Sequence, residues 1–307
     1  MFLVDEIPAW DEGLVRCTVK IEFDTPPPFW IGSALRSLIG KYLRPKDCIT
    51  CPSCDSEIKN ECVYYHLFEE KKEGGGIKPL FVSIPLPPTM FEGIMPAEVA
   101  GWSEKGRILE FGVTTVRKSF LIRWLTALIA AGMNGIKRHE FKLIEVRDHK
   151  GLLVCDGKRL NVPTQFDILH DVAKVDFTDF LYVQYTPHHK YLPLPLKEVV
   201  RDIWRRLLLL TNEHGNKCRI PEPKVSGQLE TYVVKCLSLP RKSKRSEKRV
   251  FHGSVGIMRY TNVELDDTAR WLLGLADVIG GGKNASFGFG FAKILRPSDV
   301  PSYIDKI

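Results

Sequence analysis

Two kinds of targeting segment are missing from this chain of 307 residues. No apolar stretch reaches the roughly 20 residues that a helix needs to cross a bilayer. The beginning of the chain, Met1–Glu6, has neither the basic start nor the long apolar core of a signal peptide. We therefore expect a cytoplasmic protein with no membrane partner. Because thiols stay reduced in the cytoplasm, its cysteines are not expected to form disulfides.

Standard nucleotide-binding motifs are missing as well. The glycine-rich run 280–291 reads Gly-Gly-Gly-Lys-Asn-Ala-Ser-Phe-Gly-Phe-Gly-Phe, without the Lys-Ser or Lys-Thr pair of a Walker motif. It also follows an apolar helical pattern, whereas the P-loop and the Rossmann loop follow a strand. These two absences argue against a nucleotide-binding enzyme of either type.

The same run predicts a loop that contacts phosphate in a different way. Glycine lets a backbone approach a ligand closely, and successive amides can form a concave site for phosphate oxygens. An ordinary turn is the alternative interpretation. The alternating Phe287, Phe289 and Phe291 indicate one face of a strand. The predicted contact residues are Gly281, Gly282, Lys283, Ser286, Gly288 and Gly290.

A modest excess of positive charge is concentrated in one segment. The chain has 44 basic and 37 acidic residues, a net charge of +7. Residues 241–249 hold six cations against one acid, Glu247. Such a block is typical of a solvated loop without a partner, but it also attracts polyanions regardless of their sequence. The six cations are Arg241, Lys242, Lys244, Arg245, Lys248 and Arg249.

Hydrophobic periodicity predicts the same order of elements in each half of the chain. Strand patterns lie at 14–23, 107–116, 140–147, 180–186, 229–239 and 250–260. Helical patterns lie at 31–42, 120–129, 196–210 and 265–279. The basic block 241–249 falls between two strand patterns, so it is predicted to form the tip of a hairpin.

Each half therefore reads approximately β-α-β-β-α-β, which is the ferredoxin-like order. We predict an α+β fold of two tandem ferredoxin-like domains. The N-terminal domain is placed at 1–150 and carries a cysteine-rich insertion at 45–66. The C-terminal domain is placed at 179–307 and carries the basic hairpin and the glycine-rich loop.

The insertion contains four closely spaced cysteines, Cys48, Cys51, Cys54 and Cys62. Four neighbouring thiols in a cytoplasmic protein indicate a metal site. Tetrahedral zinc on four thiolates is the first choice, and its closed coordination predicts a structural role. An iron–sulfur cluster is an alternative, because cysteines at this spacing also hold such clusters. Free thiols in a polar loop are the remaining interpretation.

Three stretches of the chain follow the pattern of one known protein family. Residues 29–40 resemble its first helix, with the pattern Gly-x-x-Leu-Arg. Residues 62–69, Cys-Val-Tyr-Tyr-His-Leu-Phe-Glu, follow three cysteines as in a cysteine-bearing branch. Residues 251–291, which end in the glycine-rich run, resemble its C-terminal domain. The family is the RAMP superfamily of CRISPR-associated proteins, and the greatest similarity is to the endoribonuclease that cuts precursor CRISPR RNA within its repeats.

The resemblance implies tandem ferredoxin-like domains, CRISPR repeat RNA as the substrate and no catalytic metal. The 2′-hydroxyl of the RNA would attack the adjacent phosphate and leave a 2′,3′-cyclic phosphate and a 5′-hydroxyl. This chemistry needs a base, an acid and a cation that stabilises the phosphorane.

The candidates for these roles depart from the family pattern. Many relatives have a histidine in or just after the first helix, but this chain has none before His66. A cysteine segment folded on its metal would bring His66 and Tyr64 back towards Lys41, and these three are the predicted catalytic residues. A histidine without a chemical role is the alternative for His66. His188 and His189, on a loop after a strand pattern, are a second candidate, and ordinary surface histidines are the alternative for them. His252 is interpreted as a strand residue.

Contacts with RNA are expected from both ends of the chain. Arg36 and Arg44 lie on the polar side of the first helical pattern, and they join the basic block and the glycine-rich loop as predicted RNA-binding residues. Two other functions stay open. One is a non-catalytic subunit that binds CRISPR RNA beside other Cas effector subunits, and the other is a zinc-stabilised nucleic-acid adaptor.

Overall fold

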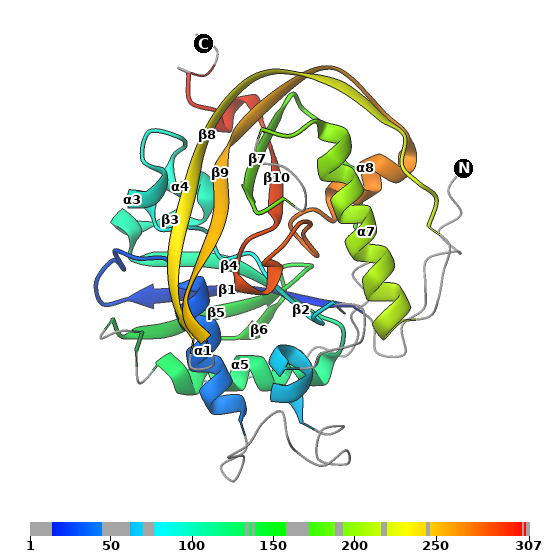
Figure 1. The fold of residues 1–307 in the computed structure, drawn as a ribbon. Coiled ribbons are helices and arrows are strands. Elements are labelled where there is room, and N and C mark those ends of the chain that lie inside the picture. Colours follow the sequence, from blue (N-terminus) through cyan, green and yellow to red (C-terminus); the bar gives the residue numbers. More distant parts are fainter. Residues whose placement is uncertain are drawn as a thin grey trace.

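The computed structural model describes residues 14–44, 62–69, 77–132, 135–136, 139–157, 172–187, 193–215, 220–243, 246–302 and 304. For Glu69, 240–243 and 246–249 it describes the backbone alone. Two antiparallel sheets with helices beside them form an α+β structure (Figure 1).

The first sheet has the strand order β2-β4-β1-β5-β6, with β3 paired to β4. Helix α5 packs on β1, β4 and β5, and helix α1 packs on α5. Short helices α3 and α4 and the turn η3 lie between β2 and β4. The strands are β1 (Val15–Phe23), β2 (Leu80–Val82), β3 (Trp102–Ser103), β4 (Ile108–Thr115), β5 (Phe141–Asp148) and β6 (Leu153–Cys155). The helices are α1 (Gly32–Leu43), α3 (Pro88–Phe91), α4 (Ala97–Ala100), η3 (Glu104–Gly106) and α5 (Lys118–Gly132).

The second sheet has the order β10-β7-β9-β8 and is accompanied by helices α7 and α8. Strands β8 and β9 form a ribbon that arches over the front of the molecule (Figure 1). The strands are β7 (Phe180–Tyr185), β8 (Val225–Ser243), β9 (Ser246–Leu265) and β10 (Phe291–Leu295). The helices and turns are α7 (Leu196–His214), α8 (Asp267–Gly274), η4 (Ala285–Phe287) and η5 (Pro297–Asp299).

Both sheets have the topology of a ferredoxin-like unit. In each, the first strand lies between the third and the fourth, and the second strand lies outside the third. The prediction of two tandem ferredoxin-like units is therefore confirmed. Local patterning explains this success, because every second residue of β1, from Val15 to Phe23, is buried on the helix side of the sheet.

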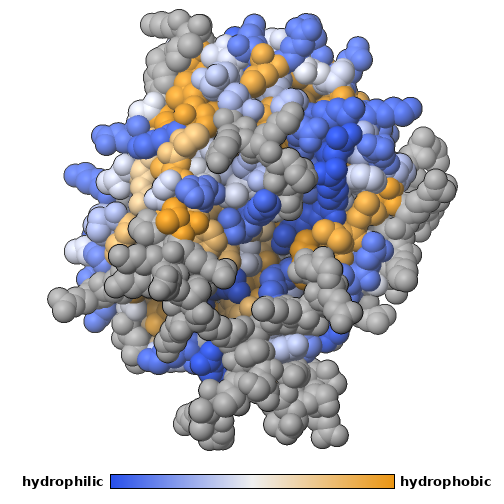
Figure 2. Space-filling model, in the orientation of Figure 1, coloured by the Kyte–Doolittle hydropathy of each residue, from blue (hydrophilic) through white to orange (hydrophobic). Residues whose placement is uncertain are grey.

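The ribbon confirms the predicted position of the basic block. Strands β8 and β9 pair from Val225↔Leu265 to Ser243↔Ser246, and Arg241 lies opposite Arg249. Strand β9 pairs with β7 only as far as Ser254, so the ribbon continues beyond the rest of the sheet. Hydrophobic residues are exposed along the left of the molecule in Figure 2. Val250 of β9 is 48% exposed.

The expectation for the three phenylalanines was wrong. Phe291 begins β10, but Phe287 ends the turn η4, and Phe289 lies between the two elements. The flanking Gly288 and Gly290 have φ angles of 93° and 100°, which no strand residue adopts. The segment therefore coils before it enters the sheet.

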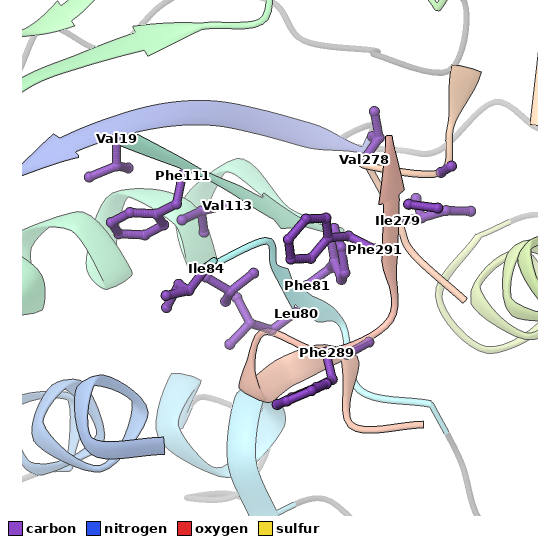
Figure 3. Close-up of a cluster of buried hydrophobic side chains, with 14 of the residues drawn as sticks. Val19, Leu80, Phe81, Ile84, Phe111, Val113, Val278, Ile279, Phe289 and Phe291 are labelled. Atoms are coloured by element: carbon purple, nitrogen blue, oxygen red, sulfur yellow. The ribbon is translucent and has the colours of Figure 1, made fainter. Parts of the chain in front are cut away.

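The two sheets share a continuous apolar core. Figure 3 shows Phe81 of β2 beside Phe291 of β10 and Ile279, which follows α8, while Val19, Phe111 and Val113 extend the same cluster into the first sheet. All of these side chains are buried. In the part of the chain that the structure describes, no helix is both long and apolar enough to cross a membrane.

Candidate functional site

The glycine-rich loop, residues 280–290, is docked on the beginning of α1. Gly32 permits this contact, because an added Cβ would overlap the carbonyl oxygen of Phe287. Trp30, just before α1, packs edge-on against Phe289 with ring centroids 5.1 Å apart. It packs in the same way against Phe251 of β9 at 5.7 Å. The loop, the ribbon and α1 therefore meet at one junction.

Arg36 lies at the centre of this junction. Its Nη1 donates to Ser286 Oγ at 2.9 Å, and its Nη2 donates to the carbonyl of Phe68 at 3.4 Å. Its guanidinium carbon lies 4.2 Å from the ring centroid of Phe287 and 4.7 Å from that of Phe68. Two predicted RNA-binding residues, Arg36 and Ser286, are thus brought together.

Most of the glycine loop is folded against the protein itself. Gly281 donates its amide to the carbonyl of Gly290 at 2.6 Å, and Gly290 donates to the carbonyl of Gln184 at 2.7 Å. Gly288 donates to the carbonyl of Ala285 at 3.3 Å. These three glycines are buried. The prediction that the Gly281 amide contacts phosphate is therefore wrong for this conformation, because its donor is already used.

Lys283 is the exposed part of the loop. Its backbone amide donates to the carbonyl of Thr186 at 2.7 Å. The hydroxyl of the same threonine donates to the carbonyl of His252 at 2.9 Å, and Nδ1 of His252 lies 3.2 Å from Ser238 Oγ. Thr186 therefore joins the loop to the ribbon, and Gly282 lies half-buried beside it.

The three predicted catalytic residues lie in different surroundings. Tyr64 is buried, and its hydroxyl accepts a hydrogen bond from Arg44 Nη2 at 2.8 Å. His66 lies in the π-helical turn η2 (Tyr65–Glu69) and stacks on Phe120 of α5, with ring centroids 5.7 Å apart. Lys41 is exposed, and its ammonium lies 5.9 Å from the ring centroid of Tyr42.

The predicted metal site falls mainly outside the described residues, because Cys48, Cys51 and Cys54 lie there. Cys62 is buried three residues before η2 begins, and its carbonyl accepts the amide of His66 at 3.1 Å. Within the described ranges no three histidine, cysteine or acidic side chains are grouped as metal ligands. A thiol at Cys62 suits zinc, and the site stays a prediction.

The basic block is described in part. The backbones of Arg241, Lys242, Lys248 and Arg249 belong to the ribbon, whereas Lys244 and Arg245 lie outside the described residues. A pocket of about 580 Å³ lies elsewhere, between β1, β5 and the end of α5, and none of the predicted site residues lines it.

Partly buried polar contacts help to fix the two domains against each other. Arg16 of β1 donates to the carboxylate of Asp277 at 2.9 Å. Arg206 of α7 donates to the carbonyl of Ile279, and its guanidinium lies 5.8 Å from the ring centroid of Phe81. Burial lowers the pKa of Arg206 to about 10. Burial, and then the charge of Asp202, raise the pKa of Tyr185 well above its ordinary value.

Sequence reasoning missed several residues of the junction. Phe68 and Phe287 carry the contacts of Arg36, but their spacing resembles ordinary core patterning. Gln184 lies in an otherwise apolar and aromatic strand, and no neighbouring polar residue indicates that its side chain bonds to the other domain. His252 lies on β9, as its strand pattern predicts, and only tertiary structure brings it beside the loop.

Solved structures with this fold include proteins called Cas6. A Cas6 product complex matches with a TM-score of 0.50 and 16% identity, over 92% of this chain and 100% of that chain. The structure of a Cas6-related gene from Pyrococcus furiosus matches with a TM-score of 0.46 and 14% identity, over 93% and 100%. The fold is thus that of the tandem ferredoxin-like proteins represented by the Cas6 product complex.

Sequence comparison places the chain more narrowly. The model of the AF_1859 N-terminal domain matches residues 13–164, and that of the AF_1859 C-terminal domain matches residues 178–294. An uncharacterized protein of Archaeoglobus fulgidus is 30% identical over 268 residues, which are 86% of this chain and 88% of the relative. The chain belongs to the AF_1859 family.

Proposed function

We propose that this protein binds CRISPR repeat RNA across the junction of α1, the glycine loop and the β8–β9 ribbon. The observation that carries the proposal is the docking of the loop on α1, which holds the exposed Lys283 beside the base of a ribbon with a cationic tip. The Cas6 fold and the resemblance to the RAMP superfamily support the choice of RNA.

Phosphate contacts explain how such a surface binds RNA. Lys283 offers one cation near Thr186, and the block 241–249 offers six more against one acid. Contacts of this kind position RNA without reading its bases. Recognition of a repeat would depend on the shape of a stem or on unpaired bases.

We further propose that the bound RNA is cut without a catalytic metal. A base removes the proton from the 2′-hydroxyl, the oxygen bonds to phosphorus, and the 5′-oxygen leaves with a proton from an acid. His66 remains one candidate, with Tyr64 and Lys41 as its predicted partners. The predicted pair His188 and His189 lies outside the described residues. His252 is a further candidate, because it is exposed and lies 3.2 Å from Ser238 Oγ beside the loop.

A non-catalytic RNA-binding subunit is the second candidate function. The specific observation that favours it is the burial of Tyr64, whose hydroxyl is bonded to Arg44 at 2.8 Å. In this arrangement Tyr64 cannot reach a substrate, so the predicted acid–base set is incomplete. Besides RNA, the partners of such a subunit would be other Cas effector subunits.

One experiment distinguishes these functions. Purified protein is incubated with end-labelled repeat RNA in excess chelator, and both binding and cleavage are followed. A cut at one position with a cyclic phosphate end supports the nuclease, and tight binding without a cut supports the subunit. If the protein does not bind RNA even at low salt, both functions are contradicted. The remaining function would be a zinc-stabilised adaptor that binds another nucleic acid.

Single-turnover rates then identify the histidine. We compare His66→Ala and His252→Ala with His149→Ala, a control on the β5–β6 turn at the opposite edge of the first sheet. Removal of a general acid or base lowers the rate by roughly 100-fold or more. If both variants cut at the rate of the control, neither histidine is catalytic.

A further inference from the structure

We infer that Arg36 is a positioning residue that braces the glycine loop, and that it does not serve as a phosphate contact. The RNA part of this inference rests on the proposed function. Sequence reasoning placed Arg36 on the polar side of the first helix, where a cation would face solvent and RNA. The structure gives that cation partners within the protein.

The hydrogen bonds of Arg36 connect three segments that are far apart in the chain. Arg36 belongs to α1, Ser286 belongs to the loop 250 residues later, and Phe68 belongs to η2. A charged donor strengthens both bonds relative to bonds between neutral groups. Since Ser286 is three residues after Lys283, holding its hydroxyl also restricts the backbone that carries Lys283.

The ring contacts explain why this position needs arginine. The guanidinium carbon lies within 4.7 Å of the centroids of both Phe68 and Phe287. A planar guanidinium can stack on rings while its edge donates hydrogen bonds, but a lysine ammonium is a point charge without that geometry. Substitution by lysine keeps the charge and loses the brace, so the two roles of the residue can be separated.

The surroundings show that the loop depends on close contacts at this end. Gly32 touches Phe287 so closely that a methyl group would overlap its carbonyl. Phe287 also packs on Phe251 of the ribbon, with ring centroids 5.0 Å apart. Arg36 packs on the same ring, and its loss is expected to free η4 and the adjoining Lys283.

RNA binding tests the inference through its salt dependence. A direct phosphate contact adds about 0.7 to the slope of log affinity against log salt for a single strand. We expect Lys283→Ala to lower the slope by that amount. We expect Arg36→Ala and Arg36→Lys to weaken binding roughly tenfold at an unchanged slope. Arg296→Ala, which removes an arginine that is 79% exposed at its side chain, is the control for charge and should change neither quantity.

The opposite pattern would overturn the inference. If Arg36→Lys binds like the unmodified protein while Arg36→Ala loses the slope of one contact, Arg36 touches phosphate. Ser286→Ala provides a milder test in case Arg36→Ala does not fold. Its effect on affinity should be non-additive with that of Arg36→Lys, because residues in contact are energetically coupled. Full additivity would also count against the brace.

Hydrogen exchange supplies a readout that does not depend on RNA. We expect Arg36→Lys to speed exchange at the amides of Gly281, Gly288 and Phe289, which are bonded within the protein, while β4 amides keep their rates. Unchanged exchange in the loop would refute the brace. If the unmodified protein binds no RNA and the loop still loosens, the proposed function fails and the brace stands.

Discussion

The side-chain oxygen of Gln184 in β7 accepts the backbone amide of Leu86 at 2.8 Å and thereby ties the second sheet to the first domain. The nitrogen of the same side chain donates to the carbonyls of Ile84 and Gly288. Gln184 is fully buried. One side chain therefore satisfies three backbone groups, of which one belongs to the glycine loop.

Replacement of Gln184 by leucine should destabilise the protein strongly. The three backbone groups would stay buried without partners, and each unsatisfied group costs about 1–3 kcal/mol. We expect the free energy of unfolding in urea to fall by about 2–5 kcal/mol. Gln228→Leu on the exposed part of β8 is the matched control. A loss no greater than that of the control would show that the two domains do not depend on Gln184.

Stability should fall in alkali because of Cys17. Burial, and then the charge of Asp148, raise the pKa of the Cys17 thiol from 9.0 to about 12. Between these values the unfolded chain has lost a proton that the folded chain keeps. The contribution is complete below pH 9, and the free energy of unfolding then falls by about 1.4 kcal/mol per pH unit.

Urea unfolding at pH 8 to 10 checks this assignment to Cys17. We expect Cys17→Ala to remove the fall between pH 9 and 10, and Cys236→Ala, at an exposed position, to leave it in place. Buried Tyr182 and Tyr260 also have raised pKa values through burial, so ionisation of tyrosines in the unfolded chain adds to the fall above pH 10. Identical profiles for both variants would contradict the assignment to Cys17.

Alanine at Gly290 should disrupt the junction. The residue has a φ of 100°, and an added Cβ would overlap the carbonyl oxygen of Gly281. We expect a loss of about 3 kcal/mol or more, because backbone strain adds to the overlap. Gly151→Ala is the control, since that glycine has a φ of 82° and no atom near the added Cβ. Gly151→Ala should lose only about 1–2 kcal/mol. Equal losses in the two variants would show that backbone conformation alone causes the effect.

The four cysteines Cys48, Cys51, Cys54 and Cys62 should hold one metal ion. Protein purified without oxygen should contain zinc, and Cys51→Ser should remove most of it, because each thiolate of a structural site contributes to affinity. Elemental analysis measures the content, with Cys236→Ser as the control. If the protein contains iron and a matching amount of sulfide, the site holds an iron–sulfur cluster and not zinc. If it contains no metal, the four cysteines are free thiols.

The cationic tip should contribute to RNA binding through charge. We expect the triple change of Lys242, Lys244 and Lys248 to alanine to lower the salt slope by about 2, since each phosphate contact adds about 0.7 for a single strand. Fluorescence anisotropy at several salt concentrations measures the slope. If the tip is solvated and has no partner, the triple variant will have the same salt slope and the same affinity as the unmodified protein.

The helices and strands of this fold could be predicted because each depends on the periodicity of residues that are near in sequence. The stripe of α7 from Leu196 to Leu210 is buried as its periodicity indicates, and the basic block marks a hairpin because charge separates two apolar strands. The docking of the domains has no such pattern. Arg16 and Asp277 are 261 residues apart, and the sequence around neither residue indicates which residue it pairs with.

The glycine loop shows why a site is harder to predict than a strand. Glycines at positions such as Gly280 allow a close approach, and the sequence does not say what approaches. Here it is the protein itself, because an added Cβ at Gly280 would overlap the ring of Phe81. The same holds for Arg36. Its place on the polar side of a helix predicts contact with solvent, whereas its guanidinium lies against two phenylalanines from distant segments.

The long separation between Arg36 and Ser286 has a consequence for biogenesis. A ribosome makes the chain from its N-terminus, and domains tend to fold in that order. Here the first domain emerges with Trp30 and the start of α1 uncovered, because the loop that covers them follows some 250 residues later. Contacts between such remote segments slow folding. The nascent first domain thus waits for nearly the whole chain before its surface is closed, and a protein truncated before the glycine loop keeps that surface open.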